Sequence, residues 1–321
     1  MLYSFDEVCG QINSGKLLHV AASENLLRKL PKGNWIGGST EYFMTENGGI
    51  VSSELLFVTE FFVPEFKISS YCADSVSHVT NDAFENGYSI VIIPFESETH
   101  KTYAQNAAHF DGMFIKNIVG WISGTNLSKP EQVAISVNGQ TGEVSQNDAA
   151  VLHLGLPKEK TVQISIINIF EQDEKTPVLE FDEEGFQVTY CRVDGRQVRL
   201  EDSVKNGEID IKLPIVGDYS GAGINISYRS LENGAVNLYA PVFKGIKYRH
   251  AKPVANYAEE FSSKLAAIKN SESVFSCNCV LNFLFGELEG KKIDAFFGPI
   301  TFGEIAYQLV NQTLVYVSVL D

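Results

Sequence analysis

Residues 224–239 have the sequence Ile-Asn-Ile-Ser-Tyr-Arg-Ser-Leu-Glu-Asn-Gly-Ala-Val-Asn-Leu-Tyr, and this stretch decides the fold class. Polar side chains alternate with apolar ones on both sides of Asn233-Gly234. A period of two is typical of strands with one buried and one solvated face. Asn-Gly favours the two-residue turn of a hairpin. We therefore expect a β-hairpin with arms at 224–228 and 235–239.

The segments around this hairpin differ in character. Residues 126–245 are nearly all strand, with turn pairs such as Asp-Gly and Asn-Gly between apolar runs. Residues 1–125 alternate helix and strand, and include a buried strand at 88–95 followed by a helix at 97–109. Residues 246–321 return to mixed structure. The predicted fold is α+β, with layered mixed and antiparallel β-sheets covered by helices and a β-rich middle segment.

The charge balance limits the kinds of partner. The 321 residues include 25 Lys and Arg against 40 Asp and Glu, which gives a net charge of −15. Affinity for nucleic acid or for anionic lipid depends on Lys and Arg that neutralise phosphate charge. We therefore expect neither a nucleic acid nor a membrane as a partner. No apolar run approaches the roughly 20 residues needed to span a bilayer.

The cysteines and histidines indicate the compartment and the state of the core. Five cysteines are scattered along the chain, an odd number that argues against a disulfide framework. The chain start has no basic segment followed by an apolar one, as a signal peptide would have. We expect a cytoplasmic protein with reduced thiols. His19 and His153 lie in apolar strands, where hydrogen-bonded core histidines are expected.

Two segments place glycine beside a hydroxyl at the end of a strand. Glycine permits close approach of a backbone or ligand, and the hydroxyls and free N–H groups can hold a carboxylate or carbonyl. The plain alternative is a tight turn closed by a Ser or Thr cap, with no ligand. The two segments are Gly37-Gly38-Ser39-Thr40 and Gly298-Pro299-Ile300-Thr301-Phe302-Gly303-Glu304.

A third segment, Ser276-Cys277-Asn278-Cys279, lies at a predicted junction from strand to helix. A helix N-terminus suits an anionic group and lowers the pKa of a thiol. Cys277 or Cys279 is therefore the candidate nucleophile of an alternative hypothesis, a cysteine-dependent enzyme. Ordinary buried thiols beside a capping Asn278 are the plain alternative. Structural zinc needs four ligands, and no second Cys/His pair lies nearby, so we expect no metal. The sequence shows no general base for either thiol, so we name no catalytic residue, and we expect no cofactor.

The three segments together resemble motifs of the FIST-type family of sensory proteins. Ile36-Gly37-Gly38-Ser39-Thr40 resembles the glycine-hydroxyl signature of the N-terminal half of that family. Three motifs between residues 275 and 314 resemble its C-terminal half in the same order. They are Phe275-Ser276-Cys277-Asn278, Phe302-Gly303-Glu304-Ile305 after Phe297-Gly298, and Asn311-Gln312-Thr313-Leu314.

This resemblance implies a FIST-N-like half at 1–125 and a FIST-C-like half at 246–321, while the segment 126–245 departs from the family. It also implies a sensory protein that binds an amino acid or a similar small carboxylate without catalysis. No output region is recognisable, so the chain would either pass a signal through a protein partner or act as a stand-alone binder. The predicted ligand-binding residues are Gly37, Gly38, Ser39, Thr40, Cys277, Asn278, Gly298, Thr301, Gly303 and Glu304, with Glu41 or Glu304 as the partner of an amino group.

Overall fold

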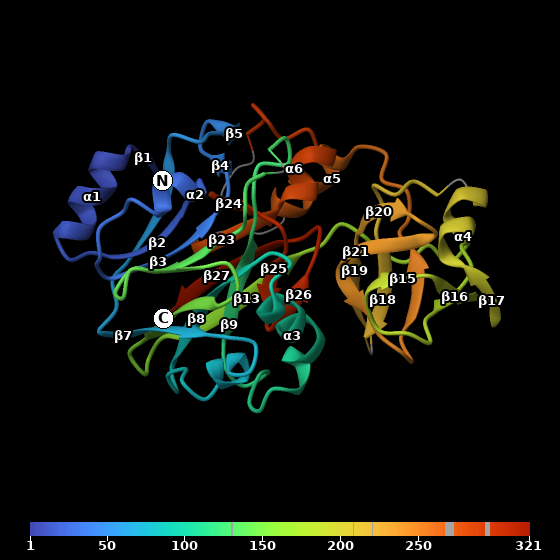
Figure 1. Ribbon diagram of the computed structural model, residues 1–321, viewed down its shortest axis with the longest axis horizontal. Coiled ribbons are helices and arrows are strands. Elements are labelled where there is room, and N and C mark those ends of the chain that lie inside the picture. Colours follow the sequence, from blue (N-terminus) through green and yellow to red (C-terminus); the bar gives the residue numbers. More distant parts are fainter. Residues whose placement is uncertain (130, 208, 220, 267–272, 293–295) are drawn as a thin grey trace.

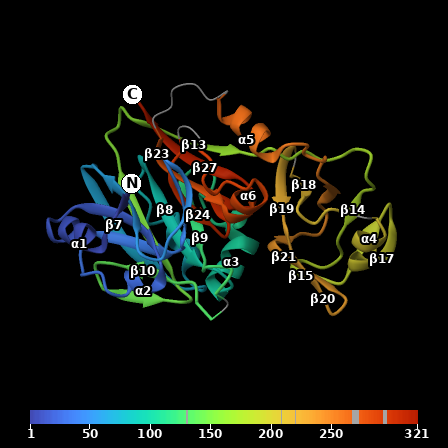
Figure 2. The same ribbon diagram turned by 90° about the horizontal axis from the view of Figure 1, so that it is seen from above.

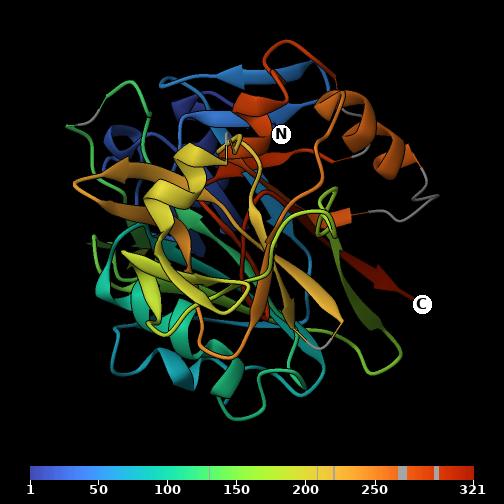
Figure 3. The ribbon, with the colours of Figure 1, turned by 90° about the vertical axis from the view of Figure 1, so that its right-hand side faces the viewer.

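The computed structural model describes residues 1–129, 131–207, 209–219, 221–266, 273–292 and 296–321. Its elements form two bodies, which lie side by side in Figures 1 and 2. The larger body contains both chain ends. The smaller body extends from β14 (Leu179–Glu180) to β22 (Lys247–His250), and Figure 3 looks onto it.

The larger body contains three six-stranded sheets, in which each strand is hydrogen-bonded to the next. From edge to edge, the first sheet contains β1 (Leu2–Tyr3), β6 (Leu56–Phe61), β2 (Leu17–Ala22), β3 (Trp35–Ser39), β10 (Ser136–Asn138) and β11 (Glu143–Ser145). The second contains β26 (Gln308–Val310), β25 (Glu304–Ala306), β9 (Ile118–Ser123), β8 (Gly87–Pro94), β12 (Ala149–Gly155) and β7 (Glu65–Tyr71). The third contains β13 (Thr161–Ile167), β27 (Leu314–Leu320), β23 (Ser273–Cys279), β24 (Gly298–Thr301), β4 (Tyr42–Thr45) and β5 (Gly48–Val51).

Each of these sheets is mixed. A parallel pair, β2–β3, β8–β9 or β23–β24, is combined with antiparallel neighbours. Strands β2, β3, β8, β9 and β12 are buried along their whole length. Strands that are buried on both faces lack the alternating pattern, which is why the sequence shows them as continuous apolar runs. The predicted α+β class with mixed and antiparallel sheets is confirmed.

The smaller body is antiparallel. One sheet contains β17 (Arg196–Arg199), β16 (Tyr190–Val193), β14, β22, β18 (Ile215–Tyr219) and β19 (Ala222–Ile226), and the other contains β15 (Gly185–Val188), β21 (Ala235–Val242) and β20 (Tyr228–Glu232). The smaller body and the expected middle segment 126–245 have different bounds. Strands β10 (Ser136–Asn138) to β13 (Thr161–Ile167) lie within 126–245 but pair in the sheets of the larger body. Their partners outside this segment lie far away in the sequence, so a local pattern does not reveal them.

The hairpin around Asn233-Gly234 forms, but its first arm is β20, Tyr228–Glu232, rather than the predicted 224–228. Glu232 pairs with Ala235, and Asn233 and Gly234 have φ values of 54° and 79°, the left-handed conformation that this turn requires. Residues 224–226 belong instead to β19, which pairs with β18. The alternating pattern continues through the bend between β19 and β20, so it could not show where one strand ends.

The helices are short. They are α1 (Phe5–Asn13), α2 (Glu24–Leu27), α3 (Glu98–Asn106), α4 (Leu200–Asn206), α5 (Tyr257–Ala266) and α6 (Val280–Phe285), with 3-10 turns η1 (Val76–Val79) and η2 (Ala107–His109). Strand β8 followed by α3 and η2 confirms the strand and helix predicted at 88–95 and 97–109. Within the described ranges, no helix combines the length and apolarity that crossing a membrane requires.

Gly38 lets β3 pack closely against β8 and β9. A Cβ atom at this position would lie 2.5 Å from Cγ2 of Ile92 on β8 and 2.7 Å from Cη2 of Trp121 on β9. The Trp121 indole is fully buried and donates from Nε1 to Nε2 of His19 at 2.9 Å. Gly38 is therefore needed for packing between two sheets. This packing explains why the position holds glycine, which we had predicted to be a ligand-binding residue.

We predict that Gly38→Ala lowers the free energy of unfolding by about 1–3 kcal/mol, because the added methyl group overpacks the core. Chemical denaturation measures this change. Gly10→Ala in α1 is the matched control, since a Cβ there meets nothing within 4 Å. That variant should keep or raise stability, by up to about 1 kcal/mol. Equal stability of the two variants would contradict the packing role of Gly38.

Candidate functional site

The structure brings the three predicted segments into direct contact. Strand β24 lies between β23 and β4 in the third sheet. Thr40 Oγ1 donates to the carbonyl oxygen of Ile300 at 2.7 Å, and Thr301 Oγ1 lies 3.2 Å from the carbonyl oxygen of Asn278. The Thr40 hydroxyl thus connects the first segment to the second, which lies more than 200 residues later in the sequence.

These contacts fill the space that a ligand would need. Ser39 Oγ donates to the carbonyl of Gly124 at 2.8 Å and accepts from the amide of Ile135 at 2.9 Å. Ser39 and Thr40 are buried, and the hollow beside Ser39, Thr40 and Glu41 is too small for a water molecule. The Ser and Thr hydroxyls satisfy backbone groups at strand ends, as the plain alternative describes.

The glycines of the first and second segments also lie at close contacts within the protein. A Cβ at Gly298 would lie 2.1 Å from the carbonyl oxygen of Ser276, so β24 passes β23 at a distance that only glycine permits. The carbonyl of Gly303 accepts from the amide of Ile122 on β9 at 2.8 Å. Gly37 also has no room for a side chain, because Trp35 and Leu27 lie against it.

The two cysteines of β23 lie in an environment that disfavours a thiolate. Cys277 and Cys279 are each 1% exposed. Burial, together with the nearby Glu304 carboxyl, raises the pKa of both thiols well above the usual value. Cys277 Sγ donates to the carbonyl of Gly120 at 3.4 Å. A helix N-terminus lowers the pKa of a nearby thiol, but here desolvation outweighs the influence of the six-residue helix α6. The low-pKa nucleophile of the enzyme hypothesis is therefore not formed.

Glu304 is a fully buried carboxylic acid. Burial raises its pKa to about 8, although hydrogen bonds from Thr313 and Thr301 act in the opposite direction. Thr301 Oγ1 lies 2.8 Å from Glu304 Oε1 and 3.2 Å from the Asn278 carbonyl, yet a hydroxyl has a single hydrogen. A protonated Glu304 that donates to Thr301 lets Thr301 donate to the Asn278 carbonyl, so the carboxyl, the hydroxyl and this carbonyl each have a partner. Near neutral pH the acid is uncharged and does not form an ion pair with an amino group.

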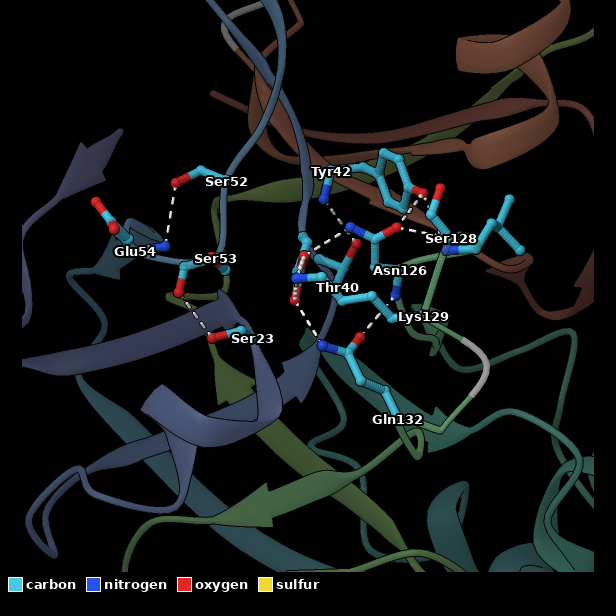
Figure 4. A network of polar contacts seen from close by, with 12 residues as sticks. Ser23, Thr40, Tyr42, Ser52, Ser53, Glu54, Asn126, Ser128, Lys129 and Gln132 are labelled. Atoms are coloured by element: carbon cyan, nitrogen blue, oxygen red, sulfur yellow. Dashed lines mark hydrogen bonds and ion pairs between the residues drawn. The ribbon is translucent and has the colours of Figure 1, made fainter.

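Glu41 holds a loop next to the strand ends. Its carboxylate accepts from Asn126 Nδ2 at 2.7 Å, from Gln132 Nε2 at 2.8 Å and from Lys129 Nζ at 2.9 Å. Burial opposes ionisation of Glu41, but these hydrogen bonds and the charge of Lys129 outweigh it and lower the pKa of the carboxyl. Figure 4 shows Asn126, Lys129 and Gln132 gathered beside Thr40. Lys129 thus supplies the ammonium group that we expected from a ligand.

A cleft of about 480 Å³ adjoins this loop. It is lined by Phe95, Glu96 and Ser97, which follow β8, and by Gly124 and Thr125, which follow β9. Because β8 and β9 are parallel, both carboxyl ends open into the same space, the usual place for a ligand in sheets of this kind. The loop held by Glu41 contributes Leu127, Gln132 and Val133 to the lining.

The smaller body completes the cleft with Arg229 from β20 and Tyr239 from β21. Arg229 forms an ion pair with Glu96, and its guanidinium carbon lies 5.1 Å from the centre of the Phe95 ring. Glu96 has a φ of 63°, which is rare for a residue other than glycine. Its amide donates to Nδ1 of the buried His100 at 3.3 Å. Backbone strain of this kind is concentrated at functional sites.

The residues of this cleft were not among the predicted site residues. A signal was present at Phe95-Glu96-Ser97, where polar residues follow a predicted buried strand and precede a helix. Arg229 and Tyr239 gave no such signal, because they reach the cleft only through the docking of the smaller body. Among the described residues, no group of three or more His, Cys, Asp and Glu side chains could hold a metal ion.

We predict that Glu304→Gln changes the pH dependence of stability. Between about pH 4.5, the usual pKa, and about pH 8, the folded wild type keeps a proton that the unfolded chain releases. The wild type should therefore lose about 1.4 kcal/mol of unfolding free energy per pH unit across this window, relative to the variant. Its stabilising contribution is complete below the window and is lost as pH rises through about 8.

Urea denaturation of both proteins over this pH range measures the difference. Glu183→Gln, at an exposed position, is the matched control and should follow the slope of the wild type. If the curves of Glu304→Gln and the wild type run parallel, Glu304 is ionised in the folded protein and the assignment is wrong.

A second prediction concerns thiol reactivity. Hydrogen bonds from Ser75 and from the backbone of Asp74 lower the pKa of the exposed Cys72, which should therefore react first with an aromatic disulfide reagent near neutral pH. Cys277 and Cys279 should react only after denaturation. Cys72→Ser should remove the fast phase. Fast modification of Cys277 or Cys279 in the native chain would restore the nucleophile hypothesis.

Comparison with known proteins identifies a family whose function is unknown. A search of curated proteins finds no match to this chain. A family of unknown function, DUF6976, matches residues 3–320, so the match includes both bodies. The chain belongs to the DUF6976 family.

Proposed function

We propose that this protein binds a small molecule in the cleft at the carboxyl ends of β8 and β9. The observation that carries this proposal is the convergence of segments from both bodies on one cavity of about 480 Å³. That volume lies within the usual range for small-molecule sites, roughly 300–1,000 Å³. Side chains from β20 and β21 of the smaller body meet strand ends of the larger body there.

The chemistry of the lining supports this cleft over a larger groove. The groove, of about 680 Å³, lies beside β6 and β23 and includes Phe57, Phe61, Val63 and Phe275. Its lining is mainly apolar and also includes polar residues such as Gln11, Glu60 and Lys160, but the larger body alone forms it. A ligand site combines apolar walls with a few placed polar groups, as the cleft does with Arg229 and its neighbours.

The proposed role is binding without catalysis. The burial of Cys277 and Cys279 removes the support for a cysteine-dependent enzyme. The resemblance to FIST-type proteins supports a sensory role, with a protein partner as the receiver of the signal. The net charge of −15 supports a small molecule rather than nucleic acid or a membrane surface as the ligand. The scattered, odd cysteines support a cytoplasmic location.

We predict that a thermal-shift screen of metabolites will find compounds that raise the melting temperature of the full chain by several degrees. A ligand at one hundred times its Kd adds about 2.7 kcal/mol of stability. Ala134→Phe fills the cleft from its lining and should abolish the shift. Ala108→Phe, at an exposed position away from the cleft, is the matched control and should keep the shift.

Two results would contradict the proposal. A shift that survives Ala134→Phe would place the ligand elsewhere on the protein. A broad screen in which no compound shifts the wild type would argue against small-molecule binding.

A further inference from the structure

We infer that the ligand of the cleft is an uncharged, planar ring compound with hydrogen-bonding groups on its edge, of the chemical class of a nucleobase or nucleoside. The inference rests on the proposed function, because it names the kind of molecule that the cleft accepts. It differs from the amino acid or carboxylate that the sequence suggested.

Aromatic side chains form one part of the lining. The centre of the Phe95 ring lies 5.8 Å from that of Tyr239 and 5.4 Å from that of Phe302. All three residues line the cleft, and they come from the end of β8, from β21 and from the turn after β24. A cluster of flat rings favours a flat ligand, because stacking of a base on an aromatic side chain contributes about 1–3 kcal/mol.

Charge in the cleft is balanced before any ligand enters. Of the residues that line it, Arg229 and Glu96 are the charged ones, and they form an ion pair with each other. A free carboxylate or ammonium group would have to separate this pair to gain its own partner. The guanidinium of Arg229 already lies over Phe95, and a guanidinium plane also accepts a stacked ring. An uncharged ring can therefore use Arg229 without breaking its pair with Glu96.

Amide side chains supply the groups that read the edge of such a ring. Gln146 and Asn147 are exposed, line the cleft and carry both donors and acceptors. The hydroxyl of Thr125 adds a group that can donate or accept. Paired carbonyl and N–H groups on a heterocycle match amides of this kind, whereas a simple hydrocarbon ring would leave them unpaired on binding.

The test uses the full chain with adenosine and guanosine as uncharged probes and with glutamate and lysine as charged ones. Isothermal titration calorimetry measures each Kd at low and at high salt. We expect at least one nucleoside to bind with a Kd that does not change with salt, since no net charge is neutralised. Neither amino acid should bind as tightly.

Three variants connect the binding to the aromatic lining. Tyr239→Leu removes the ring and should weaken nucleoside binding by roughly tenfold or more. Tyr239→Phe keeps the ring and should keep the affinity, which separates loss of stacking from damage to the fold. Tyr190→Leu, on the same body but outside the cleft lining, should bind like the wild type.

The outcomes separate this inference from the proposed function. If glutamate or lysine binds, is excluded by Ala134→Phe, and the nucleosides do not bind, the ring class is wrong and small-molecule binding stands. Nucleoside binding that Tyr239→Leu leaves unchanged also overturns the inference. If no probe binds at about millimolar concentration, where even weak ligands are detected, the inference fails, and the wider screen decides on the proposed function.

Discussion

The close contact between β3 and the parallel pair β8–β9 determines the arrangement of the larger body. It depends on Gly38, which lies against the ring of Trp121. At the ends of these strands, the Gly124 amide donates to the Ser39 carbonyl at 2.8 Å, and Ser39 Oγ donates to the Gly124 carbonyl at 2.8 Å. Two sheets are thereby joined next to the cleft, and a wider spacing would move apart the segments that line it.

The same packing explains why the predicted ligand site is filled by the protein itself. Strands that end inside a body leave backbone carbonyls and amides without ladder partners, and each unpaired group costs free energy. Hydroxyls supply the missing partners, as Thr40 does for Ile300 and Thr301 does for Asn278. A glycine beside a Ser or Thr therefore has the same appearance in sequence whether it closes a buried junction or binds a ligand.

Local features were predictable from the sequence, and features made by docking were not. The Asn233-Gly234 turn requires positive φ at both residues, and Asn-Gly is the residue pair that favours this conformation. His153, expected as a hydrogen-bonded core residue, lies 2.8 Å from Ser89 Oγ and 3.0 Å from Tyr71 OH. The cleft depends on contacts such as Arg229 with Glu96, across more than 130 residues, and no local pattern records them. The protonation of Glu304 likewise depends on complete burial, which spacing alone does not reveal.

The position of the smaller body is set by buried polar contacts. Asn225 Nδ2 donates to the carbonyl of Asn311 at 3.0 Å, and Ser227 Oγ donates to Gln312 Oε1 at 2.7 Å. All four residues are buried, so a shift of one body against the other would leave these groups unpaired in a low-dielectric interior. Ser227 lies two positions before Arg229 on the chain, so the contacts that hold the junction also fix the guanidinium over the cleft. A ligand that binds there would meet a site already assembled from both bodies, and would lose little free energy in ordering it.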